Sequence, residues 1–309
     1  SMEKNKRIKH PVILGTAAAV GAASAVALGE IYRYLFCRDP GPIAKFDKKG
    51  HASDYYEHRD SAAARMGQTP CTRYTIYSDR GDRLEGFYYQ SGDKPAGRIA
   101  FIVHGFRSDH LDAGGMYYEY YLRRGIDVFT CDNAAAGESG GAHVGYDVYE
   151  SADCLKWLDF LIKTYGEDIR VILHGFSMGG GTVVHMCDAV PPQVKFIVAD
   201  SAYTGGVDVL KPRIGALIYP LIAINRVAAG YDLRDSGVRC HLAHTRVPML
   251  FVQGTEDRTV PYYMGQELYE LCPGEKDFLW VEGARHVESM HRAPAEYEAK
   301  LDKFIGKYM

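Results

Sequence analysis

A Gly-x-Ser-x-Gly motif follows a short run of strand-forming residues near the middle of the chain. The run at 171–173 is Val-Ile-Leu, and Gly175, Ser177 and Gly179 come shortly after it, before a segment at 182–189 that can form a helix. The two glycines leave room where a side chain would block a tight turn between strand and helix. The pattern therefore predicts a sharp turn with Ser177 at its tip and its hydroxyl exposed.

The motif alone does not decide between a catalytic serine and a packing device. In the catalytic interpretation, the backbone N–H of Met178 lies at a helix N-terminus, where unpaired donors and the helix dipole favour an oxyanion. A glycine-rich loop that only lets a helix pack closely on a sheet would have the same sequence. The choice depends on whether other segments supply a general base and an acid for Ser177.

Segments with strand and helix patterns alternate along most of the chain. A hairpin is expected over 72–77 and 84–89, and 148–165 has the apolar spacing of an amphipathic helix. Further strands are expected at 99–103, 128–131, 171–173, 196–199, 249–252 and 278–281, and helices at 117–124 and 294–308. This alternation predicts an α/β protein with a mostly parallel central sheet and helices on both faces.

Residues 203–247 interrupt the alternation, because they contain no clear strand. They predict a helical insertion, and its place after a strand end favours a lid over a ligand site, with ordinary helical packing as the alternative. The expected organisation is a basic tail with a hydrophobic helix at 1–36, a linker and helix at 37–70, the first part of the core at 71–202, the lid at 203–247 and the rest of the core at 248–309.

The N-terminal segment has the pattern of a membrane anchor. Several basic residues precede Val12–Leu28, which has no charge and is just long enough for one span, and apolar character continues to residue 36. We expect membrane association through 12–36, with the catalytic domain extracytoplasmic because the positive charge precedes the span. The odd, scattered set of seven cysteines favours the cytoplasmic face instead. A cleaved signal peptide or a soluble helix would fit the same stretch.

Composition and cysteine spacing exclude several classes of partner and cofactor. The net charge is −3, and no basic run follows the first ten residues, so a nucleic-acid partner is not expected. The sequence contains no C-x-x-C and no zinc-type His/Cys spacing. We therefore expect no metal and no organic cofactor.

Two loops after predicted strands supply partners for the serine. Asp257 follows the strand at 249–252, and His286 follows the strand at 278–281. Because these strands are parallel to the one before Ser177, all three side chains are expected at the C-terminal edge of the sheet.

Other residues could replace some of these partners. Glu256 lies beside Asp257, and Asp200 ends another predicted strand, so each is an alternative acid. The second oxyanion donor is expected from Phe106, because the glycine before it permits the turn that aims its N–H at the site. His104 could be mistaken for the base, but its place before this turn favours a structural role, as does the place of His174 under the serine.

Four motifs in this order resemble those of the α/β-hydrolase superfamily, in particular its serine-aminopeptidase and monoglyceride-lipase-like branch. They are His-Gly-Phe at 104–106, Gly-Phe-Ser-Met-Gly-Gly at 175–180, Gly-Thr-Glu-Asp-Arg-Thr-Val-Pro at 254–261 and Gly-Ala-Arg-His at 283–286. The chain is also similar to uncharacterised bacterial hydrolases with an N-terminal membrane helix. The resemblance covers about 72–309 and implies the α/β-hydrolase fold, with the triad in the order serine, aspartate, histidine.

One stretch departs from the family pattern. After the second parallel strand such proteins usually have Asp-x-Arg-Gly-His-Gly-x-Ser, whereas this chain has Asp-Asn-Ala-Ala-Ala-Gly-Glu-Ser at 132–139. The alanines at 134–136 remove polar groups near the serine, so we expect an altered pocket rim and an unchanged triad.

Together these features predict a serine hydrolase, most simply a carboxylesterase for small or medium acyl esters. Ser177 would be the nucleophile, His286 its base and Asp257 the orienting acid, with the N–H groups of Phe106 and Met178 binding the oxyanion. A peptidase or amidase and an acyltransferase would use the same machinery. A non-catalytic binding protein with this fold is the alternative of a different class.

Overall fold

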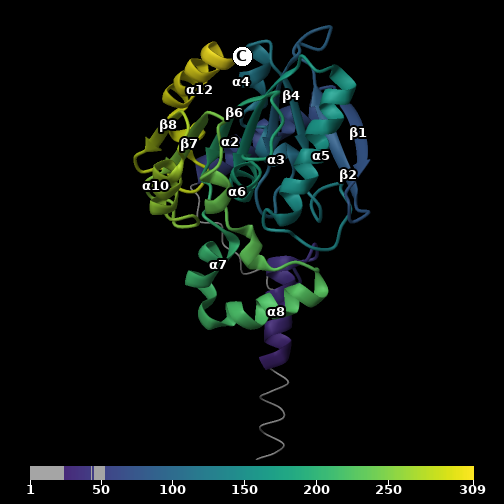
Figure 1. Ribbon diagram of the computed structural model, residues 1–309, viewed down its shortest axis with the longest axis vertical. Helices are drawn as coiled ribbons and strands as arrows, with labels where there is room; N and C mark the ends of the chain where they lie inside the picture. The colour runs from purple at the N-terminus through teal and green to yellow at the C-terminus, as the bar shows by residue number, and fades with distance from the viewer. Residues whose placement is uncertain (1–23, 43, 45–52) are drawn as a thin grey trace, which may run out of the picture.

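The computed structural model describes residues 24–42, 44 and 53–309, and its centre is an eight-stranded sheet in the order β1-β2-β4-β3-β5-β6-β7-β8 (Figure 1). The strands are β1 (Thr72–Tyr77), β2 (Arg83–Tyr89), β3 (Arg98–Val103), β4 (Asp127–Cys131), β5 (Arg170–Phe176), β6 (Val194–Asp200), β7 (Met249–Gly254) and β8 (Lys276–Val281). β2 is antiparallel to β1 and β4, and the other neighbouring pairs are parallel. The prediction of a mostly parallel sheet is confirmed.

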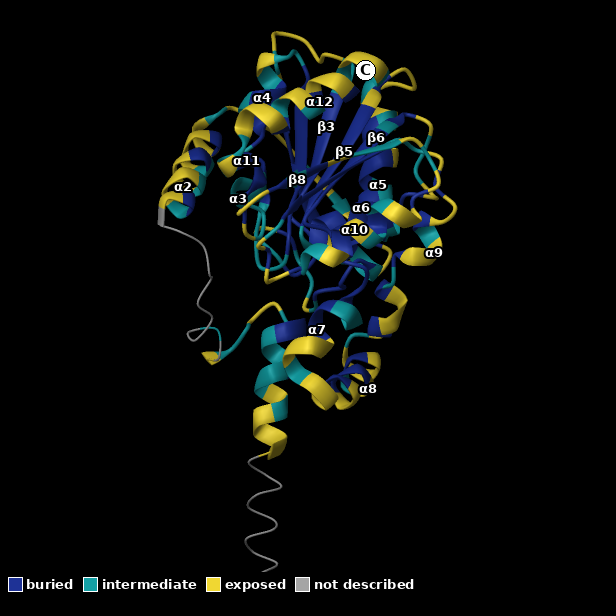
Figure 2. Cartoon of the chain, turned by 90° about the vertical axis from the view of Figure 1, so that its left-hand side faces the viewer, coloured by how far each residue is buried: buried dark blue, intermediate teal, exposed yellow. Residues whose placement is uncertain are grey.

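Helices cover both faces of the sheet. One face packs against α5 (Val148–Tyr165), α6 (Met178–His185), α9 (Arg239–Leu242) and α10 (Tyr262–Leu271). The other packs against α2 (Ser53–Gln68), α3 (His110–Gly114), α4 (Tyr118–Arg123), α11 (Ser289–Arg292) and α12 (Pro294–Tyr308). Successive strand residues point to opposite faces, so Phe101 lies in the first apolar core and its neighbour Ile102 in the second. Figure 2 shows the strands buried between these layers.

The segment between β6 and β7 is helical, as expected. It contains α7 (Gly206–Ile214), the 3₁₀ turn η2 (Gly215–Leu217), α8 (Ile218–Ala228), the 3₁₀ turn η3 (Leu233–Ser236) and α9. Together with an N-terminal helix over 24–36, α7 and α8 project from one end of the sheet (Figures 1 and 2). A third apolar cluster joins the two parts, with Leu35 and Phe36 packed among Leu210, Ile218 and Leu221.

Residues 12–23 of the predicted membrane-associated segment, 12–36, lie outside the described residues. At its described end, the side chains of Tyr32, Leu35 and Phe36 are buried within the protein. Over 24–42, 44 and 53–309, no helix has the length and apolar character required to cross a bilayer. Membrane anchoring therefore stays a prediction.

Candidate active site

Ser177 occupies a strained turn between β5 and α6, with φ 55° and ψ −116°. The flanking glycines are needed because a side chain at either position would collide with the backbone. A Cβ on Gly175 would lie 2.0 Å from the carbonyl oxygen of Gly179, and one on Gly179 would lie 2.1 Å from that of Val103. The N–H of Ser177 donates to the carbonyl of Asp200 at 2.9 Å, which ties the turn to the neighbouring strand. The predicted sharp turn is present.

The structure brings Ser177, His286 and Asp257 together in one hydrogen-bonded chain. His286 lies in the loop after β8, and its Nε2 is 2.7 Å from the Oγ of Ser177. Its Nδ1 is 2.7 Å from Oδ2 of Asp257, which lies in the loop after β7. With Nδ1–H donating to the carboxylate, Nε2 is left to accept the serine proton.

The Asp257 carboxylate is held by further donors. Its side chain is fully buried, and Oδ1 accepts the N–H groups of Thr259 and Val260, both at 2.8 Å. Oδ2 also accepts the side-chain amide of Gln253 at 2.8 Å. The sequence interpretation missed Gln253, although a glutamine at the end of an otherwise apolar strand was a usable indication. These donors fix the carboxylate toward His286.

The two alternative acids lie elsewhere. Glu256 is exposed. Asp200 accepts hydrogen bonds from Ser201 Oγ at 2.9 Å and Tyr297 OH at 2.8 Å. Burial raises the pKa of Asp200 to about 6, and the two hydrogen bonds partly offset this rise because they stabilise the carboxylate. Asp257, not Asp200, is the acid hydrogen-bonded to His286.

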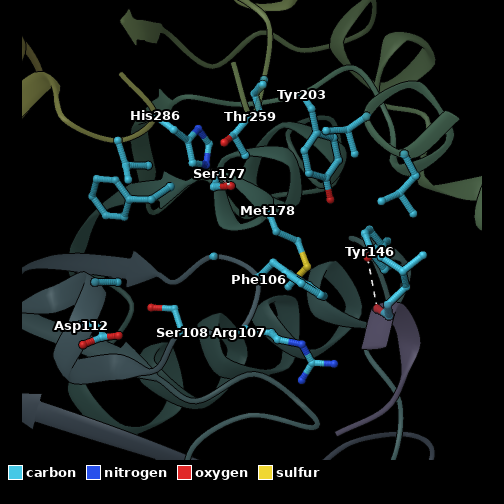
Figure 3. Close-up of a pocket in the computed structure, with 18 of the residues that line it drawn as sticks. Phe106, Arg107, Ser108, Asp112, Tyr146, Ser177, Met178, Tyr203, Thr259 and His286 are labelled. Atoms are coloured by element: carbon cyan, nitrogen blue, oxygen red, sulfur yellow. Dashed lines mark hydrogen bonds between the residues drawn. The ribbon is translucent and has the colours of Figure 1, made fainter. Parts of the chain in front are cut away.

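Both expected oxyanion donors lie beside the serine. Met178 is the first residue of α6, so its N–H has no acceptor within the helix. The loop after β3 passes close to Ser177, since a Cβ on Gly105 would lie 3.2 Å from the Cβ of Ser177. Phe106 follows in that loop and borders the same cavity as Ser177 and Met178 (Figure 3).

Comparisons with known proteins support this architecture. A protein-family profile described as "Serine aminopeptidase, S33" matches residues 94–224. A Bacillus subtilis protein named "Uncharacterized protein YqkD" is 24% identical over 306 residues, covering 95% of this chain and 96% of its own. The solved esterase Pf2001 from Pyrococcus furiosus superposes with a TM-score of 0.65 at 21% identity, over 79% of this chain and 95% of its own. Est1E from Butyrivibrio proteoclasticus, solved with ferulic acid, gives a TM-score of 0.59 at 16% identity, over 76% and 98% of the two chains.

The chain has the α/β-hydrolase fold.

Within this α/β-hydrolase fold, the two buried histidines near the serine have structural partners. His104 Nε2 accepts the N–H of Asn133 at 2.9 Å, and Nδ1 lies 2.8 Å from the carbonyl of Gly105. His174 lies between the hydroxyls of Tyr121 and Tyr297, at 2.8 and 2.9 Å. Burial lowers the pKa of both rings, that of His174 to about 3, so both are neutral at pH 7. Neither is hydrogen-bonded to Ser177 in the way that His286 is.

The serine opens into a cavity of about 660 Å³. The insertion contributes apolar side chains such as Val209 and Leu210, while Arg59 and Asp112 come from α2 and α3. The N-terminal helix contributes a further wall through the side chains of Ile31, Tyr34 and Leu35. The sequence does not predict that wall, because its apolar pattern places the same residues at the end of a membrane anchor.

The stretch that departs from the family pattern borders a second cavity of about 300 Å³. The alanines at 134–136 line it together with Arg38 and Arg107. The carboxylate of Asp132 accepts the backbone N–H and the ring nitrogen of His110, at 2.8 and 2.9 Å. The two cavities share Arg107 and Met178 as lining residues, so the stretch lies beside the serine cavity, and its effect on substrate choice stays a prediction. Within the described parts of the chain, no group of His, Cys, Asp and Glu side chains could hold a metal ion.

Proposed function

We propose that the protein is a serine hydrolase, and specifically a carboxylesterase that cleaves small or medium acyl esters through an acyl-enzyme on Ser177. One observation supports this most strongly. The Ser177 Oγ, at the tip of a strained turn and open to a cavity, lies 2.7 Å from His286 Nε2, while Nδ1 of the same ring lies 2.7 Å from buried Asp257. A surface serine has no need of such a chain of partners.

In the proposed reaction, His286 takes the proton of Ser177 as its oxygen attacks the ester carbonyl. Asp257 stabilises the imidazolium, and the N–H groups of Phe106 and Met178 stabilise the oxyanion. His286 then gives its proton to the leaving alcohol. Water, activated by the same ring, hydrolyses the acyl-enzyme and regenerates the serine. No step uses a metal or an organic cofactor.

The preference for esters is supported by the cavity and by the solved neighbours. A cavity of about 660 Å³ whose walls are mainly aliphatic and aromatic side chains suits an apolar acyl group. Pf2001, acetyl xylan esterase 1 and Est1E have the same fold, and the first two are named as esterases. The family profile, whose description is an aminopeptidase, favours an amide substrate as the second candidate. Acyl transfer to an alcohol or amine in place of water is the third.

Membrane association is a separate part of the proposal. It is supported by the apolar, uncharged stretch Val12–Leu28 and by the basic residues before it. We propose one N-terminal anchor with the catalytic domain outside the cytoplasm, and the cytoplasmic face is the alternative. Protease protection of the anchored protein in sealed membrane vesicles of each orientation distinguishes the two.

The proposed activity is tested by labelling followed by a substrate panel. A fluorophosphonate probe is expected to label the wild-type protein and the control variant Ser61→Ala, whose serine is exposed on α2, but not Ser177→Ala. On an activated ester, Ser177→Ala is expected to lower kcat by about 10⁴-fold or more. Matched esters and amides, with and without an acceptor alcohol, then separate the three candidates. An intact fold without labelling at Ser177 favours a non-catalytic binding protein.

A further inference from the structure

Arg107, the residue after the proposed oxyanion donor Phe106, binds the end of the N-terminal helix. It adopts a left-handed backbone conformation with φ 52°, which is unusual outside glycine. Its guanidinium donates hydrogen bonds to four carbonyl groups, those of Arg33, Tyr34, Cys37 and Arg38. The last carbonyls of a helix have no N–H partner inside it, and a cation there is favourable. Arg107 therefore caps the helix that ends at residue 36.

The side chain of Phe106 is held by the same helix. Its ring packs edge-on against Tyr34, with centroids 6.3 Å apart, and the centroid of the Tyr146 ring lies 5.8 Å away. The guanidinium of Arg107 lies 5.1 Å from the centroid of the Phe106 ring. The loop with the oxyanion donor thus contacts the helix end through two consecutive side chains.

The helix end is itself fixed to the body of the protein, so it can serve as a rigid support. The N–H of Arg38 donates to the carbonyl of Ala142 at 2.9 Å, and the N–H of Val144 donates to that of Phe36 at 2.8 Å. Cys37 and His143 form an isolated antiparallel bridge between these bonds. The Arg38 side chain also donates to the carbonyls of Gly137 and Ser139.

The partners of Arg107 favour a role in positioning over a role in binding substrate. The side chain is about half buried, and burial lowers its pKa. Burying a guanidinium is costly unless its donors are satisfied. Here the Nε and both terminal nitrogens donate to backbone carbonyls of the helix end, and those bonds would break if the group turned toward a ligand.

We propose that Arg107 is a positioning residue of the oxyanion hole, and that the end of the N-terminal helix is the support against which it holds the Phe106 N–H. The inference rests on the proposed function, because it assumes that an oxyanion forms at Ser177. It predicts that loosening this contact weakens binding of the transition state more than binding of the substrate.

Arg107→Ala and Arg107→Lys test the proposal, since lysine keeps the charge but cannot reach four carbonyls. With an activated ester, kcat is expected to fall by roughly 10- to 100-fold in Arg107→Ala and by less in Arg107→Lys, while KM changes little. Affinity for a trifluoromethyl ketone, which forms an oxyanion on the serine, should fall by the same factor as kcat/KM. Affinity for the product carboxylic acid should not change.

Arg124→Ala is the control for a loss of stability alone. Arg124 also makes several hydrogen bonds, including one of 2.9 Å to Asp302 of α12, and α4 and α12 lie at the opposite end of the molecule from α7 and α8 (Figure 1). It should lower the melting temperature without changing kcat. If Arg107→Lys likewise lowers the melting temperature but leaves kcat and the affinity for the ketone unchanged, the proposal is overturned.

A double-mutant cycle with Phe36→Ala tests whether Arg107 acts through the helix. Phe36 is fully buried and stacks on Tyr32, so its loss should loosen the helix end. If the helix is the support, the kcat of the double variant is no lower than the kcat of the less active of the two single variants. Additive losses of kcat would contradict the coupling. If Arg107→Ala does not fold, the same cycle is run with Arg107→Lys, and the same outcome decides. Wild-type-like turnover by Ser177→Ala would instead refute the proposed function itself.

Discussion

The floor and the roof of the serine cavity are built differently. The floor, formed by loops 104–107, 175–179, 254–261 and 283–287 at one edge of the sheet, is fixed by hydrogen bonds and by close backbone packing at its glycines. The roof, formed by α7 and α8, is held largely by apolar side chains that pack on one another and on the N-terminal helix over 24–36. Directional bonds suit chemistry that requires fixed geometry, and apolar packing tolerates exchange of side chains. Floor variants should therefore change kcat, and roof variants should change substrate choice.

Replacing each of two histidines in the floor by alanine should give the largest difference in kcat/KM. His286→Ala removes the proposed base and is expected to lower kcat/KM by at least about 10⁴-fold. His104→Ala should cost far less, because His104 only joins the oxyanion loop to Asn133. Steady-state kinetics on one activated ester measures both. Equal losses would mean that the two rings have been assigned to the wrong roles.

Asp257→Asn tests the acid of the floor. An amide in place of the carboxylate favours the wrong imidazole tautomer, and in Ser-His-Asp enzymes this lowers kcat by about 10⁴-fold. The neighbouring Glu256→Gln is a matched control, since Glu256 is exposed and should be replaceable without loss. A larger loss of kcat in Glu256→Gln than in Asp257→Asn would contradict the geometry described, because Glu256 and not Asp257 would then be the acid paired with the histidine.

The strand end below the serine should give a smaller, pH-dependent effect on stability. Burial raises the pKa of Asp200 from 3.8 to about 6, so between these values the folded protein keeps a proton that the unfolded chain releases. The free energy of unfolding of the wild type should therefore contain a contribution that falls by roughly 3 kcal/mol as pH rises from 4 to 7. In Asp200→Asn that contribution is absent. Urea unfolding at several pH values compares the two proteins, and parallel pH profiles would refute the prediction.

A roof variant should have the smallest effect and a different kinetic signature. Leu210→Ala removes an apolar wall residue, so KM for longer apolar esters is expected to rise about 10-fold, with little change in kcat. Val227→Ala, an exposed residue of α8, is the control. An ester series of increasing acyl length measures the shift. A loss of kcat that is equal for all chain lengths would remove the distinction between floor and roof.

Local patterns made the floor predictable from the sequence. The turn at Ser177 depends on neighbouring glycines, and the loops with Asp257 and His286 each follow a strand that its apolar run identifies. The observed bounds of α5 and α12 coincide with the predicted ones for a similar reason, since their apolar spacing is helical along their whole length.

Of the roof, the sequence predicts the helical insertion at 203–247 but not the N-terminal helix that packs against it, because that packing depends on contacts between distant segments. The hydroxyl of Tyr32 donates to the side chain of Asn225, 193 positions away, at 3.3 Å. No local pattern distinguishes a helix that packs on such a surface from the end of a membrane anchor. α10 was not predicted either. Its Gly265 weakens the helical pattern, but it allows close packing, since a Cβ there would lie 2.9 Å from Oε1 of Gln253.

The mass of the acyl-enzyme tests the central claim most directly. The wild-type protein, mixed rapidly with a slowly deacylating ester and quenched in acid, should gain the mass of one acyl group. Proteolysis should place that group on the peptide containing Ser177, and His286→Ala should show no burst of acylation. Acylation of another residue, or turnover of the ester with no covalent intermediate on any time scale, would contradict the account.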